Sequence, residues 1–400
     1  MSNSTDTPKG YRQSPLGQIP EDWNVERLFN IADVYSGGTP KSSNLQYFDG
    51  NIPFIKSGEI GLSQTEHCIS EDGLKASSAK MVKKGDLLYA LYGATSGQCA
   101  ISKINGAINQ AVLCIRPQCN RYFLLCVLEK NKDLYYRRYL QGGQGNLSAE
   151  IVKRYYIPIP SIEEQMKIAE VLSTWDKAIE LQTAIIEKLT LRKKGLMQQL
   201  LTGKKRLKGF SEPFCYIRAG EVFRSSSIKG AGTEELLSAT QENGVVPRRL
   251  LEGRVTMPAG NTDNFKLVEK GDFVISLRSF QGGIEYSEYQ GIVSPAYIVL
   301  KPKLHIDDSF YKYYFKSSDF IGHLAIAVIG IRDGRQISYD YFCFVKIPFP
   351  SLEEQCAISE ILVLNDREIE KEKQKLEALK QQKKGLMQQL LTGKKRVITK

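Results

Sequence analysis

The sequence predicts an α+β protein made of two globular domains, each followed by one long helix. The first observation is the stretch KKGLMQQLLTGKKR, which stands at 193–206 and again, letter for letter, at 383–396. This stretch ends a longer repeat, because 157–206 and 347–396 align without a gap and are identical at 29 of 50 positions. Between the repeats, short β-rich runs and helical stretches alternate with Gly, Ser and Asn turns. That mixture is typical of α+β domains.

Each repeated segment is predicted to form one helix with a marked beginning and end. Ser161 and Ser351 are the expected N-caps, and Glu164 and Glu354 follow three residues later. In such a capping box the hydroxyl and the carboxylate each accept a hydrogen bond from a free backbone N–H group. A glycine fits the left-handed position just after each helix. These glycines are Gly203 and Gly393.

The interior of each helix carries an apolar seam with alternating spacings of four and three residues, a period typical of helices that pack on a partner helix. The seam residues are Ile168, Leu172, Trp175, Ile179, Ile186 and Leu189 in the first helix, and Ile358, Leu362, Ile369, Leu376 and Leu379 in the second. Asn365 and Glu372 interrupt the second seam, where they either set the register or lie at its edge; the edge is favoured. Gly195 and Gly385 mark either a kink or a close helix contact.

A weaker repeat lies within the two domains. The stretch KMVKKGDLLYAL at 80–91 is similar to KLVEKGDFVISL at 266–277. Both predict a turn at Lys-Gly-Asp followed by a β-strand. Residues 145–160 and 335–350 also align without gaps. The two domains therefore share these matched stretches, called anchors here, and their sequences differ in the segments between the anchors.

The charge balance invites a nucleic-acid partner. The net charge is +11, and the two verbatim copies alone hold ten Lys and Arg residues and no acid. Basic clusters of this kind occur in nucleic-acid-binding proteins. Eight cysteines without a CxxC pair and three scattered histidines favour neither a zinc site nor a disulfide framework. The polar start and the lack of a long apolar run favour a protein of the reducing cytoplasm.

Catalytic signatures are missing from the sequence. It has no phosphate-binding P-loop, no G-x-G-x-x-G turn that opens a helix, no G-x-S-x-G elbow and no amino-methyltransferase motif. The acid pair Glu163–Glu164 is better explained as a helix start. We therefore expect a protein that recognises or assembles rather than one that catalyses.

The whole pattern resembles the specificity subunit of type I restriction–modification enzymes. The doubled helix motif carries the resemblance, together with SGGTP at 36–40, GNIPFIKSGEI at 50–60 and SLRSFQGGIEYSEYQGIVSPAY at 276–297. It spans about residues 14–396. The resemblance implies two target recognition domains separated by two long antiparallel coiled-coil helices with a pseudo-twofold internal repeat. The expected segments are target recognition domain 1 (1–155), a central conserved helix (156–206), target recognition domain 2 (207–345) and a C-terminal conserved helix (346–396).

The resemblance also implies function and partners. Each domain would read half of a bipartite, interrupted sequence in double-stranded DNA. The chain itself would be non-catalytic, would bind no cofactor or metal, and would dock two methyltransferase subunits and restriction subunits. S-adenosylmethionine and ATP would bind those partners, and the complex would act on the nucleoid of a prokaryotic cytoplasm. A scaffold or DNA-recognition protein of another modification or defence complex stays open as the alternative.

Residue chemistry selects candidate DNA contacts in loops beside the matched anchors. Arg pairs with guanine, Asn and Gln pair with adenine, and Lys, Ser and Thr hold phosphates more often. In the first domain the candidates are Lys41, Lys56, Tyr92, Thr95, Ser96, Gln144 and Asn146. In the second they are Arg278, Ser279, Gln281, Arg332, Arg335 and Gln336. The cations of the two verbatim copies have three interpretations: solvated helix ends, methyltransferase contacts, or phosphate contacts between the half-sites.

Overall fold

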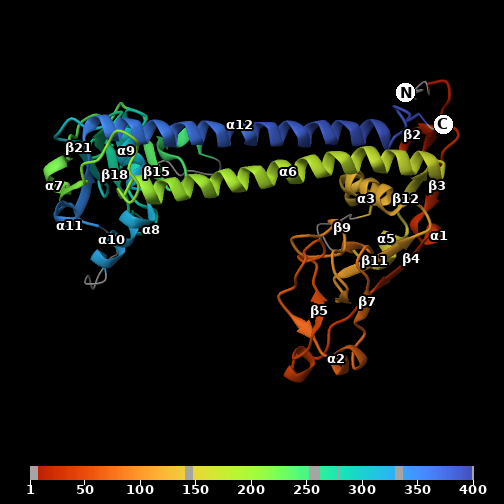
Figure 1. Ribbon diagram of the computed structural model, residues 1–400. Coiled ribbons are helices and arrows are strands. Elements are labelled where there is room, and N and C mark those ends of the chain that lie inside the picture. Colours follow the sequence, from red (N-terminus) through yellow and green to blue (C-terminus); the bar gives the residue numbers. More distant parts are fainter. Residues whose placement is uncertain (1–7, 140–146, 252–261, 278, 329–336, 399–400) are drawn as a thin grey trace. The chain divides into compact units, whose positions relative to one another are not determined.

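The structure, a computed structural model, describes residues 8–139, 147–251, 262–277, 279–328 and 337–398 (Figure 1). The chain divides into two compact units, and the divisions fall inside the two long helices. Unit 1 comprises residues 1–182 and 375–400, and unit 2 comprises residues 183–374. Each unit therefore joins one globular domain to about half of each long helix.

Unit 1 contains the N-terminal domain and the beginning of the first long helix. Its strands are β1 (Tyr11–Ser14), β2 (Gly17–Pro20), β3 (Asn24–Arg27), β4 (Ala32–Ser36), β5 (Ile52–Ile55), β6 (Cys68–Ile69), β7 (Lys80–Val82), β8 (Leu87–Ala90), β9 (Cys99–Ile101), β10 (Gly106–Ile108), β11 (Val112–Pro117) and β12 (Tyr156–Ile159). Its helices are α1 (Leu28–Ile31), the 3-10 helix η1 (Leu45–Phe48), α2 (Glu71–Lys75), α3 (Arg121–Lys130), α4 (Lys132–Tyr139), α5 (Ala149–Lys153) and the first half of α6 (Ile162–Leu200). Within this unit, α3 lies near α6, whereas β5 and α2 lie at the far end of the domain (Figure 1).

Unit 2 contains the rest of α6, the second domain and the beginning of the second long helix. Its strands are β13 (Cys215–Arg218), β14 (Phe223–Ser226), β15 (Leu237–Thr240), β16 (Gly244–Pro247), β17 (Lys266–Val268), β18 (Phe273–Ile275), β19 (Glu285–Tyr286), β20 (Gly291–Val293), β21 (Ile298–Pro302) and β22 (Lys346–Phe349). Its helices are α7 (Ala219–Val222), the 3-10 helix η2 (Arg248–Leu250), α8 (Ser279–Gly282), α9 (Asp308–Tyr314), α10 (Ser318–Val328), α11 (Tyr339–Phe344) and the first half of α12 (Leu352–Leu390). The mixed α and β composition agrees with the predicted class.

Both domains build the same four-stranded antiparallel sheet. The strand order is β4-β11-β8-β9 in unit 1 and β14-β21-β18-β19 in unit 2. Beside it in unit 1, β5 pairs in parallel with β10, with Phe54 opposite Ala107. In unit 2 a parallel bridge joins Leu236, the residue before β15, to Ile292 in β20. Strand β15 is therefore the counterpart of β5, and its antiparallel neighbour β16 is the counterpart of β6.

The two Lys-Gly-Asp turns precede strands, as predicted: β8 and β18 begin directly after them. In unit 1 the Asp86 carboxylate accepts hydrogen bonds from the backbone N–H of Lys83 at 2.9 Å and from Arg116 at 2.8 Å. In unit 2 Asp272 accepts a hydrogen bond from Lys301 at 2.8 Å. Both aspartates are 4% exposed. Their role is therefore to hold the turns, because each buried carboxylate has a cation and a backbone donor to satisfy it.

The beginnings of both long helices are capped as the sequence predicts, but only in part. The Ser161 hydroxyl accepts a hydrogen bond from the N–H of Glu164 at 3.2 Å, and Ser351 accepts one from the N–H of Glu354 at 3.3 Å. The two glutamate carboxylates accept hydrogen bonds from arginine side chains instead of completing the capping box. These carboxylates therefore contribute to tertiary contacts at the helix starts.

The glycines at the helix ends and in the helix interiors behave differently. Gly203 and Gly393 adopt the predicted left-handed conformation, with φ of 67° and 68°. A Cβ atom on Gly393 would also lie 2.2 Å from the Pro20 side chain, so the chain approaches itself closely there. Gly195 and Gly385 lie inside unbroken helices, and a Cβ atom on either would meet no neighbouring atom within 4 Å. The prediction of a close helix contact at these two positions is wrong.

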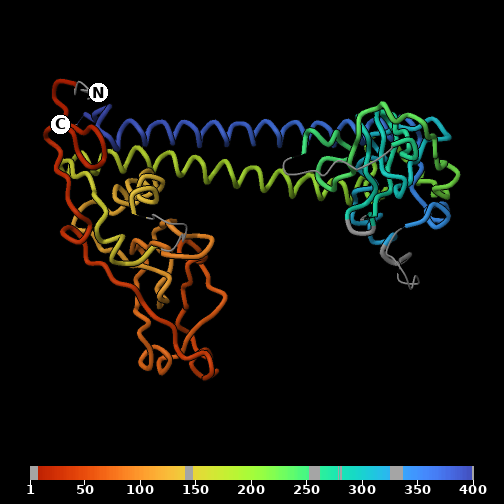
Figure 2. The backbone as a smooth tube through the Cα atoms, turned by 180° about the vertical axis from the view of Figure 1, so that it is seen from behind, coloured from red at the N-terminus to blue at the C-terminus, as the bar shows by residue number. Residues whose placement is uncertain are grey.

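Each verbatim copy closes the core of one domain. In unit 1, Leu390 and Leu391 of the second copy are buried in one cluster with Trp23. In unit 2, Leu200 and Leu201 of the first copy are buried in the core of the second domain. Figure 2 shows the end of α12, in blue, beside the first described residues, in red, and the Tyr11 hydroxyl donates a 2.8 Å hydrogen bond to the Gly393 carbonyl. The C-terminal segment is thus part of the N-terminal domain's packing.

Candidate functional site

An ion-pair cluster fixes the end of the second verbatim copy in unit 1. Arg396 donates hydrogen bonds to Glu164 at 2.7 and 2.9 Å and to Asp22 at 3.0 and 2.8 Å. The indole N–H of Trp23 also donates to Glu164, at 3.0 Å. Because the Glu164 side chain is 4% exposed, Arg396 rather than water balances its charge. The same hydrogen bonds raise the pKa of Arg396 and lower that of Asp22.

Unit 2 repeats this contact with the first verbatim copy. Arg206 donates hydrogen bonds to Glu354 at 2.8 and 2.5 Å, and the Glu354 side chain is 2% exposed. The Arg206 guanidinium lies 4.8 Å from the Phe214 ring centre, as Arg396 lies 5.9 Å from that of Trp23. The two arginines occupy identical positions in the copies, so one sequence motif makes the same contact in both units.

A second pair of contacts lies further along the helices. Lys383 Nζ lies 2.6 Å from Asp176 Oδ1 in unit 1, and Lys193 Nζ lies 2.5 Å from Asp366 Oδ1 in unit 2. A tyrosine hydroxyl from the neighbouring domain donates a hydrogen bond to each aspartate. These tyrosines are Tyr122 and Tyr313. In both units residue numbers rise along one helix as they fall along the other, so the helix segments within each unit run antiparallel.

Four of the ten repeated cations are therefore committed to ion pairs inside the chain, a role that the sequence analysis did not include. The other six side chains are exposed. They are Lys194, Lys204, Lys205, Lys384, Lys394 and Lys395. These six remain available for a partner subunit or for phosphates.

The seam residues predicted for the helices are all buried or half-buried. Asn365 is 8% exposed and accepts hydrogen bonds from Arg192 at 3.0 and 2.8 Å. The interpretation that Asn365 lies at the edge of the seam is therefore wrong. It lies within the contact between the helix segments of unit 2, where a buried polar pair favours one register.

In unit 1 the predicted DNA contacts lie in loops between strands. Lys41 is exposed after β4. Lys56 is half-buried after β5, and its Nζ lies 3.7 Å from Glu66. Tyr92 and Thr95 are half-buried between β8 and β9. These four residues stay candidates for DNA contact.

Ser96 and Ser279 are the predicted DNA contacts that are least accessible among the described residues, and their contact with DNA stays a prediction. Ser96 is 9% exposed and its hydroxyl donates a 2.9 Å hydrogen bond to the Leu91 carbonyl. Ser279 is 1% exposed and its hydroxyl accepts a 2.8 Å hydrogen bond from the backbone N–H of Ser276. Both hydroxyls hold their own loops and are withdrawn from solvent.

Six further candidates lie outside the described residues. They are Gln144, Asn146, Arg278, Arg332, Arg335 and Gln336. Gln281 belongs to α8, but the structure does not describe its side chain. Their contact with DNA stays a prediction.

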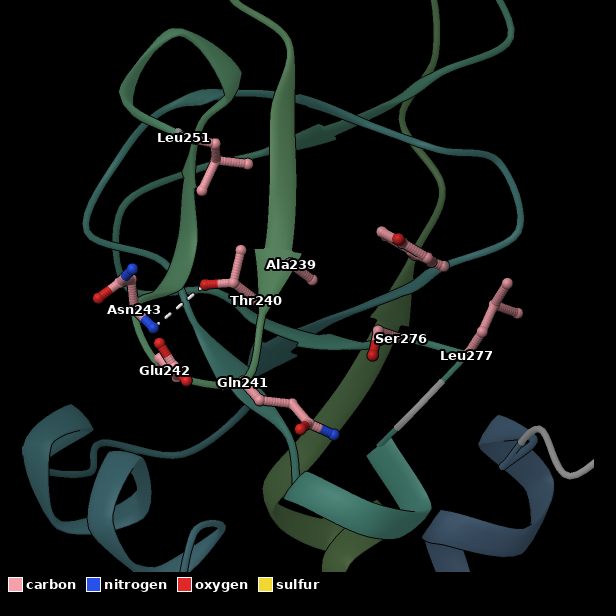
Figure 3. Close-up of a pocket in the computed structure, with 9 residues that line it drawn as sticks. Ala239, Thr240, Gln241, Glu242, Asn243, Leu251, Ser276 and Leu277 are labelled. Atoms are coloured by element: carbon pink, nitrogen blue, oxygen red, sulfur yellow. Dashed lines mark hydrogen bonds between the residues drawn. The ribbon is translucent and has the colours of Figure 1, made fainter. Parts of the chain in front are cut away.

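A hollow in unit 2 identifies residues that the sequence analysis missed. It has a volume of about 570 Å³ and lies between the β15–β16 turn and the segment after β18. Figure 3 shows Gln241, Glu242 and Asn243 on the turn, with Ser276 and Leu277 on the opposite side. The turn is the counterpart of the β5–β6 loop, which contains Lys56. The polar side chains of this turn are visible in the sequence. They do not distinguish a binding site, because most exposed hairpin turns carry polar residues.

Two features are absent from the described residues. In those residues, no cluster of three or more His, Cys, Asp or Glu side chains is placed to hold a metal ion. Across the same part of the chain, no helix is both long and apolar enough to span a membrane.

Comparisons with known proteins agree with this geometry. The family model described as "Type I restriction modification DNA specificity domain" matches residues 20–191 and 204–381. The type I restriction enzyme MjaVIII specificity subunit of Methanocaldococcus jannaschii is 26% identical over 419 residues, which is 95% of this chain and 94% of that protein.

Two solved structures share the fold. The S subunit of a type I restriction–modification system from M. genitalium has a TM-score of 0.53 and 17% identity, and the match covers 94% of this chain and 97% of that one. A chain from a study of complex assembly and conformational transition of the type I R-M system has a TM-score of 0.61 and 17% identity, over 94% and 99% of the two chains. The family match over both halves of the chain shows that it belongs to the type I restriction–modification DNA specificity family, as a specificity subunit that is not itself an enzyme.

Proposed function

We propose that this chain selects the DNA sequence for a type I restriction–modification enzyme by reading one half of a bipartite, interrupted site with each domain. The observation that carries the proposal is the repeated sheet order with unlike loops. The order β4-β11-β8-β9 recurs as β14-β21-β18-β19, while the β5–β6 loop has twelve residues and its β15–β16 counterpart has three. The two domains thus share a sheet framework and differ in their loops. This arrangement favours recognition of two different DNA sequences, because side chains that reach the base edges determine which sequence is bound.

We further propose that α6 and α12 form an antiparallel coiled coil that separates the domains with pseudo-twofold symmetry. The paired contacts of Arg396 with Glu164 and of Arg206 with Glu354 support this arrangement. So do the matched pairs of Lys383 with Asp176 and of Lys193 with Asp366. A scaffold with twofold symmetry matches the twofold-related strands of duplex DNA. The separation of the two domains along the helices would then set the distance between the two half-sites.

The same repeat supplies two like surfaces for two methyltransferase subunits, and restriction subunits would join them. The six exposed lysines of the verbatim copies are candidates for these contacts. At the start of α6, Ile162 and Met166 are 50% and 59% exposed, and exposed apolar side chains favour a protein partner. S-adenosylmethionine and ATP would bind the partners, and the assembly would act on nucleoid DNA.

The test is to purify the chain alone and together with the methyltransferase encoded beside its gene. The complex should methylate adenines in one interrupted motif, and the chain alone should neither methylate nor cleave DNA. Methylation without dependence on this chain would contradict the proposal. A gene with no neighbouring methyltransferase, and a chain that co-purifies with other defence proteins, would favour the scaffold alternative instead.

A further inference from the structure

We propose that the β15–β16 turn of unit 2 is a base-reading element, in which Gln241 and Asn243 recognise adenine edges and Glu242 recognises a cytosine amino group. The inference rests on the proposed function and names the residues that would carry out part of it. The topology assigns the position: β15 and β16 correspond to β5 and β6, so the turn corresponds to the loop of unit 1 that begins at Lys56.

Both domains place this loop beside the loop that follows the Lys-Gly-Asp strand. In unit 1 a Cβ atom on Gly93 would lie 3.9 Å from the Ser57 hydroxyl, which joins the β8–β9 and β5–β6 loops. In unit 2 a Cβ atom on Gly282 would lie 2.7 Å from the Gln241 side chain, which joins the β18–β19 and β15–β16 loops. The same two loops therefore adjoin each other in both domains. We expect this if both domains use these loops as the surface that contacts DNA bases.

The chemistry of the turn favours base edges over phosphates. Gln241, Glu242 and Asn243 are all exposed, and among the described residues none of their side chains has a hydrogen-bond partner in the chain. The turn holds no cation, and the Glu242 carboxylate would repel a phosphate. Gln and Asn can pair in a bidentate manner with adenine, and Glu accepts a hydrogen bond from the amino group of cytosine.

The backbone of the turn is fixed before any DNA arrives. The Thr240 hydroxyl accepts a 3.1 Å hydrogen bond from the N–H of Asn243 (Figure 3). The same hydroxyl donates a 3.0 Å hydrogen bond to the carbonyl of Gly244. Gly244 has a φ of 73°, and a Cβ atom there would lie 2.7 Å from the Tyr286 carbonyl oxygen. A three-residue hairpin loop followed by a left-handed glycine is a tight, defined conformation. A side chain on such a support loses less conformational entropy when it binds a base.

Lys316 acts as a positioning residue for the turn. Its Nζ donates hydrogen bonds to the carbonyl of Gln241 at 3.2 Å, the carbonyl of Gly282 at 2.9 Å and the Glu285 carboxylate at 2.6 Å. It thereby ties the two adjoining loops to each other and to the buried end of β19. The hollow of about 570 Å³ beside the turn leaves room for a base edge to approach.

The experiment uses the complex of the full chain with its methyltransferase and a plasmid library of its methylated motif, with one half-site randomised at a time. Gln241→Ala and Asn243→Ala should each weaken the preference for adenine at one position of one half-site by roughly 5- to 150-fold. The other half-site and the gap should stay unchanged. Asn243→Asp keeps the side chain's size and removes its donor, so it should relax the same position as Asn243→Ala. Gln290→Ala, an exposed amide on the β19–β20 connection, is the matched control and should change nothing.

Several outcomes would overturn the inference. An unchanged motif in both alanine variants would show the turn to be a solvated loop. A uniform loss of methylation at every sequence, with the methyltransferase still bound and the unfolding temperature unchanged, would show contact with the DNA backbone. Lys316→Met should broaden the preference at the positions of Gln241 and Asn243 together, and Lys316→Arg should restore it; a merely structural role would lower stability without moving base preference. If the wild-type complex methylates no bipartite motif, the proposed function itself has failed.

Discussion

Arg396 donates two hydrogen bonds, at 2.7 and 2.9 Å, to the carboxylate of Glu164, a residue that precedes it by 232 positions. The last residues of the chain thereby hold the start of α6 within unit 1. The contact explains why a basic helix end is needed twice: each copy supplies the arginine that neutralises a buried glutamate at a helix start.

Arg396→Ala should lower the free energy of unfolding of unit 1 by about 2 kcal/mol, the scale for losing hydrogen bonds to a buried charged group. Glu164 would keep the Trp23 indole as a donor but would lose its cation. The measurement is thermal unfolding of the full chain together with hydrogen exchange of the amides around residues 22–28 and 162–172. Lys395→Ala, which removes the neighbouring exposed cation, is the control. Equal losses of unfolding free energy in Arg396→Ala and Lys395→Ala would contradict the role assigned to Arg396.

The contact should also depend on pH in the acid range. Chiefly because of the hydrogen bonds from Arg396, the pKa of Asp22 lies below its ordinary value of 3.8. A lowered pKa means that the folded protein favours the carboxylate, so the contribution is present above pH 3.8 and is lost as pH falls through the lower folded value. The difference in stability between the wild type and Arg396→Ala should therefore stay constant from about pH 5 to 8 and shrink below about 3.8. Asp22→Asn should remove that part of the dependence, and a difference that grew on acidification would contradict the assignment.

Replacing the second domain should change one half of the recognised motif. The exchange of residues 213–345 for those of a relative keeps both helices and both verbatim copies, and therefore keeps the ion pairs of Arg206 and Arg396. The sheet frameworks match while the reading loops differ, so the half-site read by the first domain should stay intact. Methylation sequencing of the chimeric complex measures this. A change in both halves would show that the domains do not read independently.

Lengthening the helices should lengthen the gap between half-sites. Asp176 contacts Lys383 in unit 1, and Lys193 contacts Asp366 in unit 2. In the proposed coiled coil one register joins these two contacts, and Gln182 would then pair with Glu377 and Thr183 with Leu376. A heptad inserted after Gln182, with a second heptad after Leu376, keeps that register in phase. It adds about 10 Å of helix, which corresponds to about three base pairs of duplex.

The half-site sequences should not change in this variant, because the reading loops are untouched. Seven residues inserted in α6 alone serve as the control and should disrupt the pairing of the helices. A folded complex with both insertions and the original gap would show that the helices do not set the spacing.

The helices were the most predictable part of the molecule, because capping serines, a seam of period 3.5 and terminal glycines are local signals. The strands after the Lys-Gly-Asp turns were predictable for the same reason. The sequence did not indicate that Leu390 and Leu391 complete the domain that contains Trp23, since this packing joins the two ends of the chain. It also did not separate Arg206 and Arg396 from the neighbouring lysines, because only the fold shows which cation meets a buried carboxylate.

The candidate site was less predictable than the fold. Ser96 and Ser279 have the side chains of phosphate contacts, but the local turns use their hydroxyls internally. Gln241 and Asn243 had no distinguishing sequence pattern, and only the correspondence of β15 with β5 draws attention to them. Loop chemistry is informative once the topology says which loops share a face.

The most direct test is to map adenine methylation across the host genome with this gene intact and with it deleted. The account predicts that one bipartite motif, two short half-sites with an unspecified gap, is methylated in the first strain and unmethylated in the second. Expression of the wild-type chain should restore the motif. A methylation pattern that does not change on deletion, or the loss of a single uninterrupted motif, would contradict the claim that this chain reads DNA with two separate domains.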